Sequence, residues 1–136
     1  MDEKGGYWAV ADSYVRQNAE GKVTSLTVCY PKREDEESVQ LTFSDKANPI
    51  RVKLGMAEVA GLAEAVYMNR PWKAFHTFEK EGGKMETALN YRDSFINAER
   101  GAVKIALKLT ENERMSLALT LKGLHFLFVE RRCGRR

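Results

Sequence analysis

IRVKLGMAEVAGLAEAV, residues 50–66, is followed 55 residues later by a second version of itself, IALKLTENERMSLALTL, residues 105–121. Six of the 17 aligned positions are identical, among them an isoleucine at the start and a leucine–alanine pair near the end. Both copies begin with apolar residues at every second position, which is typical of a strand with one buried face, and both continue with helical spacing. The sequence therefore predicts a strand that runs directly into a helix, and predicts this unit twice.

The start of the second helix is marked by Thr110, which stands three residues before Glu113. In this pattern each side chain satisfies a backbone N–H group of the first helical turn, so it indicates a capping box. Further alternating or β-prone segments precede each copy. We expect strands at residues 7–17, 23–30 and 39–43 before the first copy, and at residues 72–80 and 85–91 before the second.

Residues 93–101 are expected to form a loop, within which residues 95–98 are either part of that loop or a short strand of their own. The resulting plan is two successive runs of antiparallel strands, each closed by a strand-then-helix unit. Because a helix buries one stripe against a sheet, both helices should cover one face of the sheets. The predicted fold class is α+β.

Size and composition indicate one ordinary globular domain. The 136 residues are 43% hydrophobic and 30% charged, and the net charge is +3 with a pI of about 8.9. We expect a flexible N-terminus at residues 1–6, a single domain at residues 7–130 and a basic tail at residues 131–136. The start of the chain is polar and no apolar run is long enough to span a bilayer, which favours a cytoplasmic protein, including one associated with the nucleoid.

The sequence contains no motif that indicates catalysis. The two histidines, His76 and His125, and the two cysteines, Cys29 and Cys133, have none of the spacings that hold a metal, and no phosphate-binding or nucleophile-elbow glycine motif occurs. We therefore expect a protein that is not an enzyme and needs no cofactor and no metal. Two distant cysteines also argue against a disulfide framework.

Basic residues alternate with the apolar ones on several strands and should lie on the face opposite the helices. Two interpretations remain open: a solvated sheet face, or a surface that attracts a polyanion. The residues expected to form this row are Arg51, Lys53, Arg92, Lys104 and Lys108.

Aromatic and basic residues are interleaved in residues 7–16 and 70–78. Single-stranded nucleic acid is bound by this mixture, because bases stack on aromatic rings while cations contact phosphates. The alternative is that Trp8 and Trp72 anchor the core, and either side of the first strand could be the buried one. The candidate nucleic-acid-binding residues are Trp8, Tyr14, Arg16, Arg51, Lys53, Trp72, Lys73, Phe75, Arg92, Lys104 and Lys108.

The last helix has more than one apolar side. One side, formed by Leu117, Leu121, Leu124 and Phe128, should face the sheet of its own chain. A surface helix with a second apolar side usually hides it against a partner, which favours a homodimer or a higher homo-oligomer. The residues expected at that interface are Leu119, Phe126, Leu127 and Val129.

The repeated strand-then-helix unit resembles the closing units of whirly and PUR-type single-stranded nucleic-acid-binding proteins, over roughly residues 7–128. Within them, the small single domain and the Arg-rich end most resemble the ThermoDBP group of archaeal proteins. The resemblance implies single-stranded DNA laid across a sheet surface, oligomers built through helices, and no catalysis. The expected function is a sequence-tolerant single-stranded DNA-binding protein, with RNA as a further ligand. The alternative is a structural or adaptor protein that binds other proteins through the sheet face and the last helix.

Overall fold

The computed structural model describes residues 6–45 and 49–134, apart from the side chain of residue 80. The expected flexible N-terminus at residues 1–6 therefore lies almost wholly outside the described residues. The first half of the chain forms a four-stranded antiparallel sheet in sequence order, which we call sheet 1, and then a helix. Its elements are β1 (Trp8–Gln17), β2 (Val23–Pro31), β3 (Ser38–Asp45), β4 (Pro49–Gly55) and α1 (Met56–Met68).

The second half repeats this arrangement with a second four-stranded antiparallel sheet in sequence order, sheet 2, and a longer helix. The predicted α+β class and the two strand-then-helix units are confirmed. The elements of this half are β5 (Trp72–Lys80), β6 (Gly83–Arg92), β7 (Phe95–Arg100), β8 (Val103–Lys108) and α2 (Glu111–Gly134).

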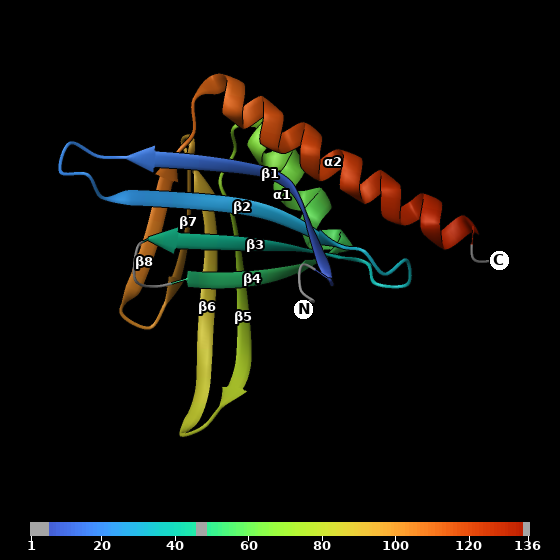
Figure 1. Ribbon diagram of the computed structural model, residues 1–136, viewed down its shortest axis with the longest axis horizontal. Coiled ribbons are helices and arrows are strands. Elements are labelled where there is room, and N and C mark those ends of the chain that lie inside the picture. Colours follow the sequence, from blue (N-terminus) through green and yellow to red (C-terminus); the bar gives the residue numbers. More distant parts are fainter. Residues whose placement is uncertain (1–5, 46–48, 135–136) are drawn as a thin grey trace.

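The two sheets cross each other steeply, and both helices lie on the same side of sheet 1 (Figure 1). At the crossing β2 and β3 contact β8, and β4 contacts β7. Both sheets turn their apolar faces toward α1 and α2, which pack against each other. Each sheet therefore has an inner face on the common core and an outer face away from it, and the two outer faces belong to different sheets.

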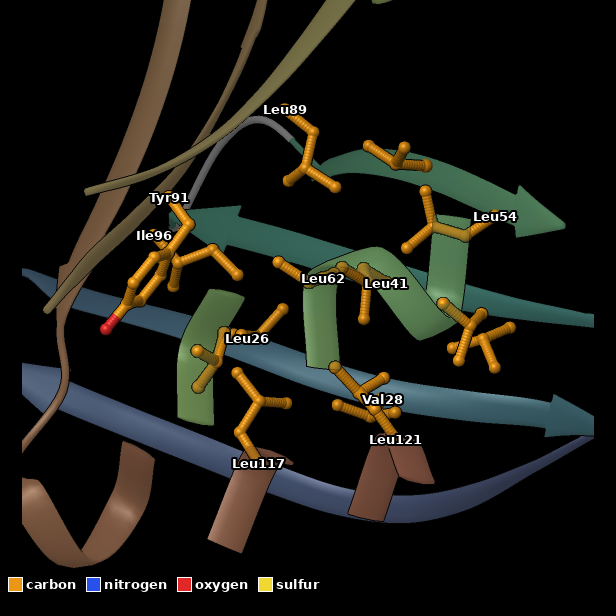
Figure 2. Packing of buried hydrophobic residues seen from close by; sticks show 14 of the residues in the cluster. Leu26, Val28, Leu41, Leu54, Leu62, Leu89, Tyr91, Ile96, Leu117 and Leu121 are labelled. Atoms are coloured by element: carbon orange, nitrogen blue, oxygen red, sulfur yellow. The ribbon is translucent and has the colours of Figure 1, made fainter. Parts of the chain in front are cut away.

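A single core joins the two halves. Leu26 of sheet 1 lies beside Leu117 of α2, Ile96 of sheet 2 lies beside Tyr91 in the same core, and Leu26, Leu117 and Ile96 are all fully buried (Figure 2). The identical residues of the repeat occupy equivalent places, since Leu62 in α1 and Leu117 in α2 are both 0% exposed. The side of α2 predicted to face its own sheet is likewise buried: Leu117, Leu121, Leu124 and Phe128.

The helix starts are fixed by glutamates at the third helical position. In α2 the backbone N–H of Thr110 donates to Glu113 over 2.9 Å, and the N–H of Glu113 donates to the Thr110 hydroxyl over 3.1 Å, so the predicted capping box is confirmed. In α1 the equivalent Glu58 accepts from the N–H of Gly55 over 3.3 Å. Gly55 has no side chain, so the N–H of Glu58 has no side-chain acceptor like the Thr110 hydroxyl of α2.

Residues 95–98, for which a loop and a short strand were both open, belong to strand β7, because Ile96 and Ala98 supply a buried face between β6 and β8. The loop expected at residues 93–101 is correspondingly shorter, and a second boundary differs as well. The basic tail expected from residue 131 is helical as far as Gly134. There Arg131 donates to the carbonyl of Pro31 over 3.1 Å and Arg132 to the carboxylate of Glu37 over 2.5 Å, so both arginines hold the end of α2 on sheet 1.

Candidate nucleic-acid interface

The outer face of sheet 2 carries exposed basic and aromatic side chains, and we call it the basic sheet face. Its composition follows from strand alternation, because the buried Leu89 and Tyr91 of β6 place Asn90 and Arg92 on the opposite side. Antiparallel pairing then aligns the outward residues of the four strands in rows.

The first row crosses three strands. Arg92 of β6 pairs in register with Phe95 of β7, which pairs with Lys108 of β8. The ring of Phe95 is 45% exposed, and the Lys108 ammonium lies 5.7 Å from its centroid. Arg92 has Asp93 at 3.6 Å, but both side chains are more than three-quarters exposed, so this ion pair is weak.

The second row is polar. Lys73 of β5 pairs with Asn90, and Asn90 pairs with Asn97 of β7. The side-chain amide of Asn90 donates to the side-chain oxygen of Asn97 over 3.3 Å. These residues line a hollow of about 520 Å³ that Arg92, Lys104 and the acidic Glu99 also border. Amides and cations around one hollow can hydrogen-bond the edges of bases and the oxygens of phosphates.

The third row contains the second exposed ring. Phe75 of β5 is 56% exposed, and the Lys73 ammonium lies 5.7 Å from its centroid. The same row ends with Glu99 of β7 opposite Lys104 of β8, a cross-strand pair of opposite charge. Glu86 lies one row further toward the β5–β6 turn, so the basic character is strongest at the Phe95 end.

The basic sheet face thus unites five of the eleven predicted nucleic-acid-binding residues. From strand spacing and rise, the Phe75 and Phe95 rings lie roughly 16 Å apart along a diagonal of the sheet. A single-stranded nucleic acid lying along this diagonal could stack one base on each ring and bring the phosphates between them to the cations. The five residues are Lys73, Phe75, Arg92, Lys104 and Lys108.

Arg51 and Lys53 do not belong to this face. They lie on β4, at the edge of sheet 1, and belong to the outer face of sheet 1, not to that of sheet 2. The single cation row expected from the sequence is therefore wrong, because the sheets cross and their outer faces diverge. Lys53 is also engaged, since its ammonium lies 3.0 Å from the carboxylate of Glu36.

The aromatic residues of β1 are placed differently from the prediction. Tyr14 is 5% exposed and its hydroxyl donates to Asp12 over 2.6 Å, so it cannot stack a base. Trp8 is half-buried and packs edge-to-face on Tyr7 with ring centroids 5.1 Å apart. A bulge between Val10 and Asp12 shifts the alternation of β1, and residues 8, 10 and 14 therefore do not share one face.

The carboxylate of Asp12 holds β1 against α2. Burial alone would raise the pKa of Asp12, but hydrogen bonds from Tyr14, Ser116 and the backbone of Ser13 outweigh it and hold that pKa below its usual value. The hydroxyl of Ser116 on α2 donates to Asp12 over 2.9 Å. Burial, followed by the bond to Asp12, raises the pKa of Tyr14 far above its usual value.

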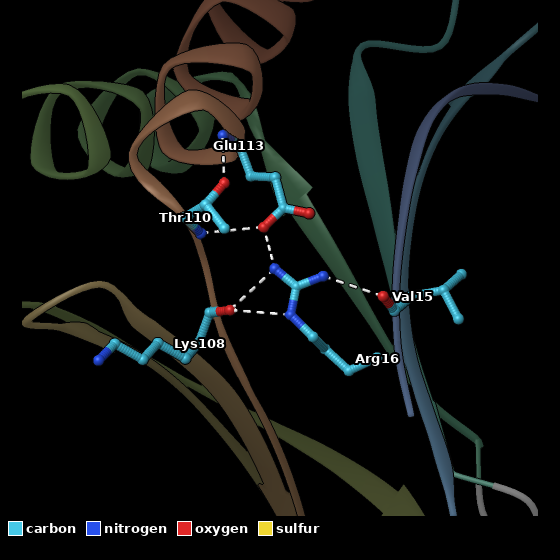
Figure 3. A network of polar contacts seen from close by, with 5 residues as sticks. All are labelled: Val15, Arg16, Lys108, Thr110 and Glu113. Atoms are coloured by element: carbon cyan, nitrogen blue, oxygen red, sulfur yellow. Dashed lines mark hydrogen bonds and ion pairs between the residues drawn. The ribbon is translucent and has the colours of Figure 1, made fainter. Parts of the chain in front are cut away.

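Arg16 joins the two halves of the molecule instead of facing a ligand. Its guanidinium lies between β1 and the junction of β8 with α2 (Figure 3). It donates to the backbone carbonyl of Lys108 over 3.0 and 3.2 Å, to the carbonyl of Val15 over 2.9 Å, and to the carboxylate of Glu113. Four of its five donors are thus used within the fold.

Trp72 lies on the inner face of sheet 2, in register with the buried Tyr91. It packs against the core and lies so close to Gly61 of α1 that a Cβ atom there would approach the indole nitrogen to 2.8 Å. Of the two alternatives for this tryptophan, the structure favours the core anchor.

Sequence reasoning missed Phe95 and Asn97, because residues 95–98 were left open between a loop and a short strand and no site residue was placed on them. The signal was present in the sequence: Ile96 and Ala98 alternate with Phe95 and Asn97 over four residues. Such a short run between a turn and a glycine does not by itself distinguish a strand from a loop.

The four residues predicted for an oligomer interface lie on two sides of α2. Leu119 and Phe126 are 61% and 63% exposed, whereas Leu127 packs partly against the core. Phe126 and Val129 line an apolar groove of about 720 Å³ between α1 and α2, to which Tyr67 also contributes. This groove lies on the helices and is separate from the basic sheet face.

Comparisons with protein-family models, with curated proteins and with solved structures gave no match to this chain. Within residues 6–45 and 49–134, no cluster of three or more histidine, cysteine or acidic side chains is arranged to hold a metal ion. In the same part of the chain, neither helix combines the length and apolar character of a membrane span.

Proposed function

We propose that this protein binds single-stranded nucleic acid, preferably DNA, on the basic sheet face and without catalysis. The observation that carries the proposal is the pair of exposed phenylalanine rings, Phe75 and Phe95, each with a lysine ammonium 5.7 Å from its centroid. Neither ring contributes to the buried core, and both lie on the same sheet face as the four cations. We expect the protein in the cytoplasm, with the nucleoid as one site of action.

Single strands should be preferred over duplex because of the rings. Cations alone bind any polyanion and favour the duplex, which has the higher charge density. Only unpaired bases offer free faces for stacking, and each stacked base contributes about 1–3 kcal/mol. The amides of Asn90 and Asn97 could hydrogen-bond base edges between the two rings.

The test is the salt dependence of binding to a fluorescent 5′-hydroxyl oligo(dT), measured by anisotropy. If the four cations of the face contact phosphates, log K against log salt should have a slope near −3, from about −0.7 per contact. Lys108→Ala should flatten the slope by about 0.7. The matched control is Lys122→Ala, because Lys122 also lies over an aromatic ring, Tyr67 at 5.9 Å, but on the helical side.

Two results would contradict the proposal. One is a duplex of equal length that competes as well as the single strand. The other is a slope that Lys108→Ala and Lys122→Ala change equally, because binding would then follow net charge and not the basic sheet face. Circular dichroism of each variant checks that the fold is intact.

We further propose that the protein self-associates through the apolar groove between α1 and α2. The support is the exposed Phe126, with Leu119 on the same side of α2 and Tyr67 across the groove. The rival function, an adaptor that binds other proteins, would use the same groove. Leu119→Glu with Phe126→Glu should reduce the mass in sedimentation to that of one chain. A wild type that is already monomeric, and binds no oligonucleotide, would favour the adaptor.

A further inference from the structure

A second basic hollow lies on the inner side of sheet 2, beyond the core. The β5–β6 hairpin extends past β4, the edge strand of sheet 1 (Figure 1). Between β4 and this hairpin is a hollow of about 250 Å³, which we call the crossing groove. Its lining includes the basic and aromatic residues Arg51, Lys53, His76, Phe78 and Arg100, and the hydroxyl-bearing Thr87.

Arg100 is held in one orientation. Its Nε donates to the hydroxyl of Thr87 over 2.8 Å, and its Nη2 donates to the backbone carbonyl of Arg51 over 2.8 Å. The guanidinium carbon lies 5.0 Å from the centroid of the Phe78 ring. A guanidinium has five N–H donors, so these bonds leave three for a ligand.

Arg51 brings a second guanidinium to the same groove. Burial, followed by the nearby positive charge of Arg51, lowers the pKa of Arg100. In the part of the chain that the structure describes, no carboxylate forms an ion pair with either arginine. Two like charges held together without a counter-ion would be stabilised by an anion.

The other two basic side chains of the groove already have carboxylate partners. The Lys53 ammonium lies 3.0 Å from Glu36, and Nε2 of His76 lies 2.8 Å from Glu58. The charges of Lys53 and Glu36 offset each other, whereas no such ion pair is formed by Arg51 or Arg100 within the described residues. Thr87 is 2% exposed, and its hydroxyl oxygen accepts the hydrogen bond from Arg100.

We propose that the crossing groove binds a phosphate group through the guanidinium groups of Arg51 and Arg100. Planar guanidinium forks match phosphate oxygens with two parallel hydrogen bonds, which an ammonium cannot do. The groove is on the opposite side of sheet 2 from the basic sheet face, so this site does not depend on the proposed function. A free phosphate compound and the terminal phosphate of a strand share this chemistry.

The direct test is calorimetric titration of the full chain with pyrophosphate at low salt. Arg51→Gln should weaken pyrophosphate binding about tenfold or more, because a charge-assisted hydrogen bond is lost. Arg100→Lys keeps the charge but removes the fork, and should also weaken it. The matched control is Arg70→Gln, which removes an arginine that follows the C-terminal end of α1 and is 58% exposed, and it should leave the titration unchanged.

Arg51 is the safer variant, because its side chain makes no hydrogen bond within the described residues and its loss should not unfold the chain. The proposal is overturned if pyrophosphate does not bind to the wild type, or if Arg51→Gln and Arg70→Gln bind it equally. Comparing oligo(dT) that carries a 5′-phosphate with oligo(dT) that carries a 5′-hydroxyl shows whether the bound phosphate is the end of a nucleic-acid strand or a free compound. A preference for the 5′-phosphate that Arg51→Gln abolishes assigns the site to strand ends, and equal binding of both, with pyrophosphate bound, assigns it to free phosphate compounds.

The two sites fail separately. Phe75→Ala should weaken binding of the 5′-hydroxyl oligonucleotide and leave pyrophosphate binding unchanged. Loss of pyrophosphate binding in Arg51→Gln with unchanged binding of the 5′-hydroxyl oligonucleotide would support both proposals at once.

Discussion

Lys53 and Lys108 occupy the same position of the repeated strand-then-helix unit, yet their surroundings differ. The Lys53 ammonium lies 3.0 Å from the carboxylate of Glu36, whereas the Lys108 ammonium lies 5.7 Å from the ring of Phe95. No carboxylate of the described residues forms an ion pair with Lys108. One lysine is neutralised within the fold, and the other is available to an outside anion.

The same contrast extends over the two outer faces. In sheet 1 the central outward positions are short and neutral, as in the cross-strand row of Ser13, Thr27 and Thr42. In sheet 2 the corresponding surface has exposed rings and cations. The inner residues of the repeat are equivalent in the two halves and the outer residues are not. The core therefore defines the architecture, and the outer face of sheet 2 carries the features that suit a ligand.

The largest expected effect concerns the equivalent inner residues. Leu62→Ala in α1 and Leu117→Ala in α2 should each lower the free energy of unfolding by about 2–5 kcal/mol, because each removes a fully buried side chain and leaves a cavity. Chemical denaturation monitored by circular dichroism measures both values. Similar losses in the two variants would support one core shared by both halves.

Leu119→Ala is the matched control for this experiment, since Leu119 is a leucine of α2 that is 61% exposed. Its effect should be within about 0.5 kcal/mol of zero. If Leu62→Ala unfolded only the first half, with two separate transitions, the two sheets would be independent units and the comparison of their inner faces would be wrong.

The next effect concerns the outer faces. Phe75→Ala and Phe95→Ala should each weaken oligo(dT) binding by about 1–3 kcal/mol, because each removes a stacking platform. The fold should tolerate both, since the rings are 56% and 45% exposed. Fluorescence anisotropy at one fixed salt concentration measures the loss.

Two controls belong with the phenylalanine variants. Phe126→Ala removes an equally exposed ring from α2, and Val15→Ala trims a residue that is 58% exposed on sheet 1. Neither should change binding to oligo(dT), provided that the mass of Phe126→Ala is unchanged. If Val15→Ala weakened oligo(dT) binding as much as Phe75→Ala, the nucleic acid would lie on sheet 1 and the proposed site on sheet 2 would be wrong.

The sequence predicted the fold well because the fold depends on local patterns. Alternation located the buried faces of most strands, and the pair of Thr110 and Glu113 located the start of α2. The site was predicted less well because it depends on which strands meet. The bulge after Val10 and the crossing of the sheets, which separates Arg51 from Lys108, arise from long-range pairing that no local pattern encodes.

Arg16 illustrates the same limit. In sequence it stands among aromatics, as a nucleic-acid-binding arginine would. In the structure it is consumed by the carboxylate of Glu113 and the carbonyl of Lys108, more than 90 residues away. An arginine that binds phosphate and one that joins two parts of a fold have the same local sequence pattern.

The smallest effect expected concerns Glu36, the residue that neutralises Lys53. Its carboxylate accepts hydrogen bonds from Ser38 over 2.7 Å, Lys53 over 3.0 Å and Tyr7 over 2.9 Å, and they lower the pKa of Glu36 from 4.5 to about 2. The folded state therefore favours the charged form. Its contribution to stability is complete above about pH 4.5 and is lost as the pH falls toward 2.

Glu36→Gln should cost about 1 kcal/mol at neutral pH, a modest value because the Lys53 side chain is 57% exposed. The difference in unfolding free energy between wild type and this variant should shrink as the pH falls from 4.5 to 2. Glu64→Gln is the matched control, because Glu64 is 70% exposed and its carboxylate lies 3.8 Å from Arg70. An equal loss in both variants, or a difference that does not change with pH, would show that Glu36 does not neutralise Lys53 in solution. The contrast between Lys53 and Lys108 would then have another cause.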